Sequence, residues 1–357
     1  MKKVLSITLG LALLVTSFTS CIWNQKHADS SITETTVQNI TGDSAIQDAE
    51  IAETEYRYDE AYPNSDAAPA SDFEYETENK YGGIKITKYI GTDSDIVIPQ
   101  MIDEAFVTII GYGAFYELEH IETVTMPNCV VAINAIAFST MPNLSKIHVS
   151  KNLRTVGMMA FSNTPSLKEV DLSMTSVTVI PRETFCESGI EYVKFNDQLE
   201  TIAEYAFRYC NSLKEIILPK NLKILGEHAF ADCRSVEKIF IPKSITTYGL
   251  FPFERNTSVT EIVFEEGILS IAAYSLWTYG GTVESVIIPA GVESIGDGCF
   301  DWYDSKLKSI YFEGNAPNIG SFALGDPTQV TIYYDPSTQG WEEISIKNDY
   351  HMEVWAK

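Results

Sequence analysis

A repeated pattern of apolar positions, with a period of about 23 residues, dominates this sequence. Each copy ends in an aromatic residue or a leucine, which usually follows an alanine and lies five residues after an aliphatic side chain. Nine successive intervals between 22 and 24 residues predict a repeat architecture instead of separate globular domains. The terminal positions are Phe115, Phe138, Phe161, Phe185, Phe207, Phe230, Phe253, Leu276, Phe300 and Leu324.

A strand signal follows each terminal position. In the copy that begins after Phe207, Leu213, Ile216 and Leu218 alternate with polar residues before Pro219. This alternation predicts a strand with one buried face, and the proline predicts its end. Glycine often stands four residues before the terminal position, where we expect a bend with positive φ, at Gly111, Gly157, Gly226, Gly249, Gly296 and Gly320.

The repeats predict an α/β-type repeat solenoid. One unit cannot bury its own apolar face, whereas stacked units share a continuous core. We therefore expect a leucine-rich-repeat right-handed coil of about ten 22–24-residue units, with a parallel sheet on one face. The coil and its N-terminal cap are predicted over residues 81–336, and residues 337–357 are predicted as a C-terminal cap or tail.

The unit that ends at Phe230 reads Leu222-x-x-Leu225-Gly226-x-x-Ala229-Phe230, and Val236-x-x-Ile239-x-Ile241-Pro242 follows it. This unit resembles that of BspA-like leucine-rich-repeat proteins of bacterial surfaces. The resemblance covers residues 81 to about 336. It implies a bacterial surface protein, and adhesion to host or matrix proteins is attributed to some members of the family. Residues 83–99 are similar to the N-terminal cap of that family.

The first 21 residues predict export. Lys2 and Lys3 precede an apolar run that is too short to span a bilayer, as in a secretory signal. The segment Phe18-Thr19-Ser20-Cys21 resembles a bacterial lipobox, although leucine is usual in place of Phe18. We expect lipidation at Cys21 and an anchored position at the cell surface; a plain secreted protein and an uncleaved signal are the alternatives.

Residues 22–80 are predicted to form an acidic, disordered tether. They hold fourteen acidic and three basic residues, so their net charge is 3 − 14 = −11, and their apolar residues show no period. A flexible leader whose length and charge have no role is the alternative. The whole chain carries a formal net charge of −24, which excludes nucleic acid and anionic lipid surfaces as electrostatic partners. Membrane contact is then expected only through the lipid anchor.

The sequence offers no candidate for catalysis. His27 lies in the predicted tether, and the other four histidines fall at different repeat positions. All five lie outside any hydrolase or metalloprotease motif, so we expect no enzyme, metal or cofactor. The acidic run Thr92–Asp95 is predicted to be a turn instead of a calcium loop. Cys210 and Cys233 occupy the same repeat position, where they form either a disulfide or a pair of small thiols that fill a repeated core position.

Two columns of outward-facing strand residues are candidates for surface roles. One column alternates in charge at Lys146, Glu169, Glu215, Lys238 and Glu261, which supports the sheet. The other changes from polar residues to five apolar ones, which predict a binding stripe for a protein or peptide ligand. Its residues are Ile217, Phe240, Val263, Ile287 and Tyr311.

Other interpretations remain open at this stage. The apolar column can instead reflect β-propensity, or it can be covered by the segment Trp341–Trp355. Glycan capture by Trp277, Tyr279, Trp302 and Tyr303 is an alternative function, since aromatic rings stack on sugars. A purely structural envelope spacer is another.

Overall fold

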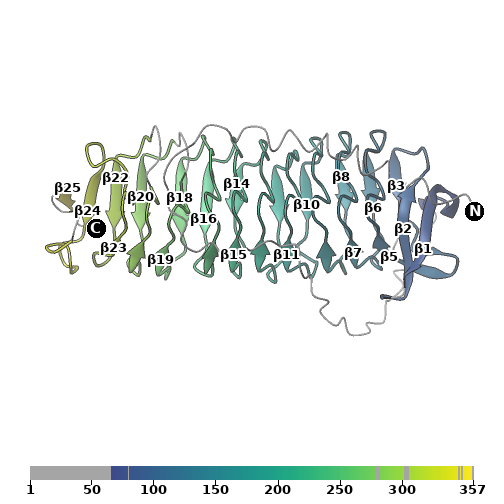
Figure 1. Cartoon of the computed structure of the whole chain (residues 1–357), viewed down its shortest axis with the longest axis horizontal. Helices are drawn as coiled ribbons and strands as arrows, with labels where there is room; N and C mark the ends of the chain where they lie inside the picture. Colours follow the sequence, from purple (N-terminus) through teal and green to yellow (C-terminus); the bar gives the residue numbers. More distant parts are fainter. Residues whose placement is uncertain are drawn as a thin grey trace, which may run out of the picture. The chain divides into compact units, whose positions relative to one another are not determined.

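The computed structural model describes residues 66–78, 80–277, 282–300, 305–344, 346 and 349–355. Within them, the chain winds into a β-solenoid in which each turn contributes one strand to each of two faces (Figure 1). The strands of the main face, which run parallel, are β3 (Asp95–Val97), β6 (Thr123–Thr125), β8 (Lys146–His148), β10 (Glu169–Asp171), β12 (Tyr192–Lys194), β14 (Glu215–Ile217), β16 (Lys238–Ile241), β18 (Glu261–Phe264), β20 (Ser285–Ile288), β22 (Ser309–Phe312) and β24 (Thr331–Tyr334).

The second face consists mainly of two-residue strands. They pair parallel in three groups, β2 (Gly83–Tyr89) to β9, β11 to β17 and β19 to β23. Turns connect the two faces, and the described ranges contain almost no helix. The strands of the second face are β5 (Ala105–Ile110), β7 (Ala132–Ile133), β9 (Thr155–Val156), β11 (Val179–Ile180), β13 (Thr201–Ile202), β15 (Ile224–Leu225), β17 (Thr247–Tyr248), β19 (Ser270–Ile271), β21 (Ser294–Ile295) and β23 (Asn318–Ile319).

This architecture confirms the predicted leucine-rich-repeat coil with a parallel sheet on one face. On the main face Ile216 pairs with Ile239 and Ile239 with Ile262, so equivalent residues of successive repeats lie side by side. All three side chains are buried, as the alternation predicted. The returns from the main face are turns and short strands instead of helices.

The repeated aromatic residues form a stacked column, called here the phenylalanine ladder. Its rings from Phe115 to Phe253 are buried, and their successive centroids lie 4.8 to 6.0 Å apart. Tyr89 extends the ladder at the N-terminal end, 5.5 Å from Phe115. Leu276, Phe300 and Leu324 continue the series and are also buried. The ladder is the shared core that the 23-residue period predicted.

The expected reason for the repeated glycines is wrong. None of the six has a positive φ. A Cβ at Gly226 would instead lie 2.4 Å from the backbone carbon of Ala203, and one at Gly249 would lie 2.1 Å from the backbone nitrogen of Glu227. These glycines therefore allow the backbones of adjacent turns to approach each other.

The left-handed conformation occurs two residues before each ladder position. Glycine occupies this position only at Gly113 and Gly298, and larger residues adopt the same conformation in the other repeats. Each repeat therefore makes the same bend whatever residue it carries there. The larger residues are Ile136, Met159, Glu183, Tyr205, His228, Phe251, Tyr274 and Phe322.

The predicted boundary between the tether and the coil at residue 80 is too late. After the 3-10 segment η2 (Ala70–Asp72), strand β1 (Phe73–Glu78) pairs antiparallel with β2 (Gly83–Tyr89). Phe73 is buried and Tyr75 half-buried, while Glu76 forms an ion pair with Lys85. Acidic residues thus alternate along β1 with apolar residues that face the core. The acidic composition of the segment does not indicate this alternation. The rest of the predicted tether, residues 22–65, lies outside the described residues.

Two further short strands complete the ends of the coil. Near the N-terminus β4 (Met101–Ile102) pairs antiparallel with β5. At the C-terminal end β25 (His351–Val354) pairs parallel with β24. Trp341 is buried there, with its ring 5.0 Å from Phe312 and 5.1 Å from Tyr334. This indole covers the rings at the C-terminal end of the core that the described residues form.

Candidate binding surface

The five predicted stripe residues lie in one column on the main face. Phe240 of β16 pairs with Ile217 on one side and Val263 on the other, and Ile287 pairs with Tyr311. Strands β18 and β20 are neighbours without a hydrogen-bonded ladder between them. Ile217 is 61% and Ile287 51% exposed, whereas the other three side chains are half-buried. These five residues are called the apolar stripe below.

The C-terminal segment meets the apolar stripe at one end. Strand β25 adds to the edge of the sheet beyond β24 and does not cross the main face. The ring of Trp355 lies 5.0 Å from that of Tyr311, and Tyr333 stacks on the same tyrosine at 4.6 Å. Among the described residues, the tail thus covers Tyr311 in part and leaves Ile217 and Ile287 exposed.

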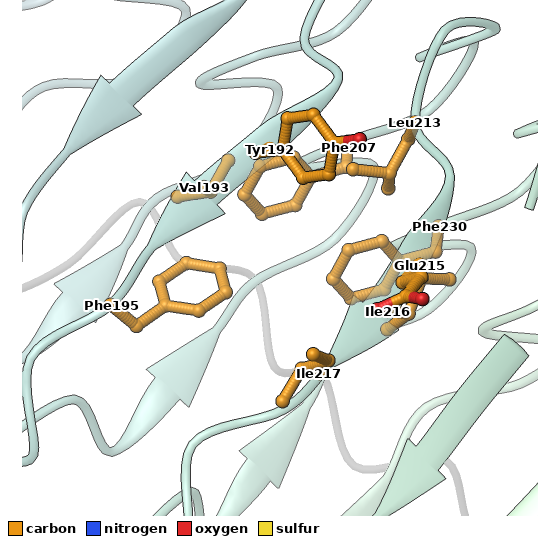
Figure 2. A pocket seen from close by; sticks show the side chains of 9 residues that line it. All are labelled: Tyr192, Val193, Phe195, Phe207, Leu213, Glu215, Ile216, Ile217 and Phe230. Atoms are coloured by element: carbon orange, nitrogen blue, oxygen red, sulfur yellow. The ribbon is translucent and has the colours of Figure 1, made fainter.

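A gap in the main face adjoins the N-terminal end of the stripe. Strands β12 and β14 are not hydrogen-bonded to each other, although β11, β13 and β15 remain paired behind them on the second face. A cavity opens in this gap, and Figure 2 shows Val193 and Phe195 on one side and Ile216 and Ile217 on the other. The gap is called the strand break. Its remaining lining residues are Tyr192, Phe207, Leu213, Glu215 and Phe230.

Phe195 lies at this opening, where its side chain is half-buried. The equivalent residues in the adjacent repeats are Leu172 and Leu218, which are buried, whereas Phe195 is half-buried. Its ring meets that of Phe207 edge-on, with centroids 6.0 Å apart. A ring at this position does not by itself separate strands, because Phe312 and Tyr334 occupy the equivalent position in paired strands. In the sequence this level is marked by the larger side chain of Phe195 and by the 22-residue interval between Phe185 and Phe207.

The charged residues beside the stripe form fewer pairs than their alternation predicted. Lys238 and Glu261 pair at 3.1 Å, as expected for adjacent strands. Glu169 instead pairs diagonally with Lys194, which also approaches Asp171 at 3.5 Å. Among the described residues Glu215 has no ion-pair partner, although Lys238 lies on the next strand. The carboxylate of Glu215 therefore remains available at the edge of the strand break.

A second group of aromatic residues lies along one edge of the coil, at the left-handed positions. Tyr205 stacks on His228 at 5.5 Å, His228 approaches Phe251 at 6.0 Å, and Phe251 lies 5.5 Å from Tyr274. Trp277, which the sequence suggested as a glycan contact, packs 5.0 Å from Phe251. The other suggested contacts, Tyr279, Trp302 and Tyr303, lie outside the described residues.

Ionisable groups along this edge interact with one another. His228 lies 3.0 Å from Glu254, while the guanidinium of Arg208 lies over the ring of Tyr205. Burial acts to raise the pKa of Glu254, but the hydrogen bond and charge of His228, together with nearby arginines, outweigh it and lower the pKa. This carboxylate is therefore held in its charged form.

The cysteines of the coil are suited to packing and not to nucleophilic chemistry. Cys210 and Cys233 are free and buried, and each thiol donates to a carbonyl of the preceding repeat, at 3.1 Å. Burial raises the pKa of Cys129 and of Cys299 to about 12, so both stay protonated at neutral pH. The two stacked thiols fill a repeated core position, which was one of the two interpretations of their spacing.

Other features of the described residues bear on metals and membranes. No group of three or more His, Cys, Asp or Glu side chains in these ranges is placed to hold a metal ion. No helix in the same ranges is both long and apolar enough to cross a bilayer. Cys21, the predicted lipidation site, lies outside the part of the chain that the structure describes.

Comparison with known proteins agrees with this architecture. The family described as BspA type Leucine rich repeat region matches residues 95–186, 178–302 and 274–339, in six copies. A leucine-rich repeat protein from Bacteroides ovatus has a similar fold, with 18% sequence identity, coverage of 80% of this chain and 75% of that chain, and a TM-score of 0.62. No curated protein sequence matches the chain significantly.

Two other solved structures are more distant. A leucine rich cell surface protein from Faecalibacterium prausnitzii is 16% identical, with coverage of 82% of this chain and 95% of that chain and a TM-score of 0.34. The pneumococcal vaccine antigen PcpA is 17% identical, with coverage of 80% and 98% and a TM-score of 0.35.

Proposed function

Because the chain belongs to the family of BspA-type leucine-rich-repeat proteins, we propose that it is a non-catalytic surface protein whose repeat array binds a protein or peptide ligand. The observation that carries this proposal is the apolar stripe. Neighbouring repeats present apolar side chains outward in one column, and the described tail leaves most of that column open. An exposed apolar stripe on a regular sheet favours association with another protein.

Binding measurements on two stripe variants test this proposal. The full chain is immobilised and presented with a panel of purified extracellular-matrix proteins, and dissociation constants are measured for each saturable ligand. We expect Phe240→Asp and Ile287→Asp to weaken binding at least tenfold, about 1.4 kcal/mol, because each places a charge in the desolvated contact. The matched control is Leu269→Asp, which changes a side chain that is 59% exposed and lies outside the stripe.

The outcome separates a binding role from a structural one. Unchanged affinity in both stripe variants, with native circular dichroism, would show that the ligand binds elsewhere. A chain that binds no member of the panel saturably would instead favour a structural envelope spacer. Equal losses in the stripe variants and in Leu269→Asp would point to a general effect of added charge.

Glycan capture is a second candidate function, supported by the aromatic column at the edge of the coil. Tyr205, His228, Phe251 and Tyr274 present rings at successive repeats, and the guanidinium groups of Arg182 and Arg208 lie over the ring of Tyr205. Aromatic faces of this kind suit stacking on sugar rings. On a glycan array, Phe251→Ala is expected to remove the signal while Phe240→Asp retains it; the reverse pattern contradicts glycan capture at this edge.

The proposed anchor rests on the N-terminal sequence. A lipid on Cys21 would hold the coil at the outer surface of a bacterial envelope through residues 22–65. In a bacterial host, the full chain is expected to incorporate labelled palmitate and to fractionate with membranes. Cys21→Ala is expected to abolish the labelling, and labelling that persists in this variant would refute the assignment.

A further inference from the structure

The strand break leaves main-chain groups unpaired on both of its sides. In the preceding pair of strands, the amide of Leu172 donates to the carbonyl of Lys194 at 2.8 Å. One repeat further along, the equivalent bond would run from the amide of Phe195 to the carbonyl of Ile217, and it is absent. One donor and one acceptor thus lack their usual partners where the cavity opens.

The beginnings of the two strands show the same interruption. The amide of Glu191 donates to the carbonyl of Lys168 at 2.8 Å. The equivalent bond, from the amide of Lys214 to the carbonyl of Glu191, is also absent. Unpaired strand edges of this kind are templates for another extended chain, which gains main-chain hydrogen bonds by adding to them.

The cavity between these edges is suited to an apolar side chain. Phe207 and Phe230 of the phenylalanine ladder lie at its base, and Val193, Leu213 and Ile216 contribute to its walls (Figure 2). The equivalent of Val193 in the other repeats is buried, whereas Val193 itself is half-buried because its neighbour has moved away. A bulky apolar side chain placed here would restore this lost contact.

The charged and aromatic residues around the cavity favour particular ligand residues next to the inserted side chain. Glu215 lines the cavity and has no ion-pair partner among the described residues, in contrast to Glu169 and Glu261 at the equivalent positions. Tyr192, also at the edge, is 54% exposed and offers a ring face to a cation. The chain as a whole carries a net charge of −24. These features are complementary to lysine or arginine.

We propose that the strand break between β12 and β14 binds an extended peptide segment of a partner protein, which inserts a bulky apolar side chain and carries a lysine or arginine beside it. The main chain of the segment bonds to the free groups of Phe195 and Ile217. This inference rests on the proposed function, since Ile217 belongs to both the strand break and the apolar stripe. The inference specifies which segment of the partner would bind next to the apolar stripe.

Peptide selection on the full chain tests the inference. A random nonapeptide library is displayed and selected against the full chain, and the dominant peptide is synthesised as the probe. We expect that probe to combine a bulky apolar residue with a neighbouring lysine or arginine. Val193→Phe, which fills the cavity, is expected to weaken binding at least tenfold, and Glu215→Lys at least threefold. Methylation of the backbone nitrogens of the probe is expected to weaken its binding at least tenfold, because it removes the main-chain donors.

The controls separate this inference from the proposed function. Circular dichroism shows whether Val193→Phe still folds, and Glu215→Lys changes an exposed side chain, so it keeps the test valid if Val193→Phe does not. If Phe240→Asp weakens binding and the strand-break variants do not, the stripe binds peptide and this inference is refuted. The inference is also refuted if N-methylation has no effect, if the probe lacks a basic residue, or if selection yields no peptide.

Discussion

Replacing one ring of the phenylalanine ladder measures how strongly the repeats depend on one another. Phe161 is fully buried, with its ring centroid 5.6 Å from that of Phe138 and 5.3 Å from that of Phe185. Phe161→Ala removes the ring and leaves a cavity between two turns, which is expected to cost about 3–5 kcal/mol in the free energy of unfolding. Phe161→Leu keeps much of the apolar volume but loses both ring contacts, together about 1–3 kcal/mol.

Urea unfolding followed by far-ultraviolet circular dichroism measures both variants. The expected order of stability is wild type, then Phe161→Leu, then Phe161→Ala, and leucine should be tolerated because Leu276 and Leu324 occupy the same position naturally. Phe322→Ala is the control, since its side chain is 78% exposed and its loss should change stability by less than about 0.5 kcal/mol. A cost below about 1 kcal/mol for Phe161→Ala would refute the ladder as a shared core.

Three further predictions concern other parts of the coil. Gly226→Ala would place a Cβ 2.4 Å from the backbone of the preceding repeat and is expected to lower the free energy of unfolding in urea by about 1–3 kcal/mol. The control Gly291→Ala, whose Cβ would lie 3.5 Å from the nearest atom, should be nearly neutral. Equal effects of the two substitutions would contradict the close-approach explanation. Cys129 and Cys299, whose pKa values burial raises to about 12, should resist iodoacetamide at pH 8 until urea unfolds the chain, and rapid labelling of the native protein would contradict their burial. Because the pKa of Glu254 is lowered from its ordinary value of 4.5, its charged carboxylate stabilises the fold at pH values above 4.5, and this contribution is lost as the pH falls through the folded-state pKa. Glu254→Gln should therefore reduce the acid sensitivity of thermal unfolding. An unchanged dependence of the melting temperature on pH would exclude this contribution.

The sequence predicts those features that depend on regular spacing. A 23-residue interval places Ile217 beside Phe240 and stacks Phe138 on Phe161, because parallel strands in register bring equivalent positions together. The buried ladder and the outward stripe both follow from this register. Neither requires knowledge of distances between turns.

The remaining features depend on contacts through space that the spacing does not encode. The function of Gly226 lies in the closeness of the preceding backbone, while the left-handed bend occurs two residues later, at His228. The strand break lies where Phe195 follows β12 and where the interval between Phe185 and Phe207 is 22 residues, and neither feature of the sequence indicates a separation of strands. The sequence does not predict strand β1, because its short alternation of apolar and acidic residues lies in a segment whose acidic composition favours disorder.

The one-sided interruption between β12 and β14 also has a mechanical consequence. Backbone hydrogen bonds still join β11, β13 and β15 on the second face at this level, so the two halves of the coil remain connected there while the main face is free to widen or narrow. A bend of the coil at this level would therefore open the main face while the second face stays paired.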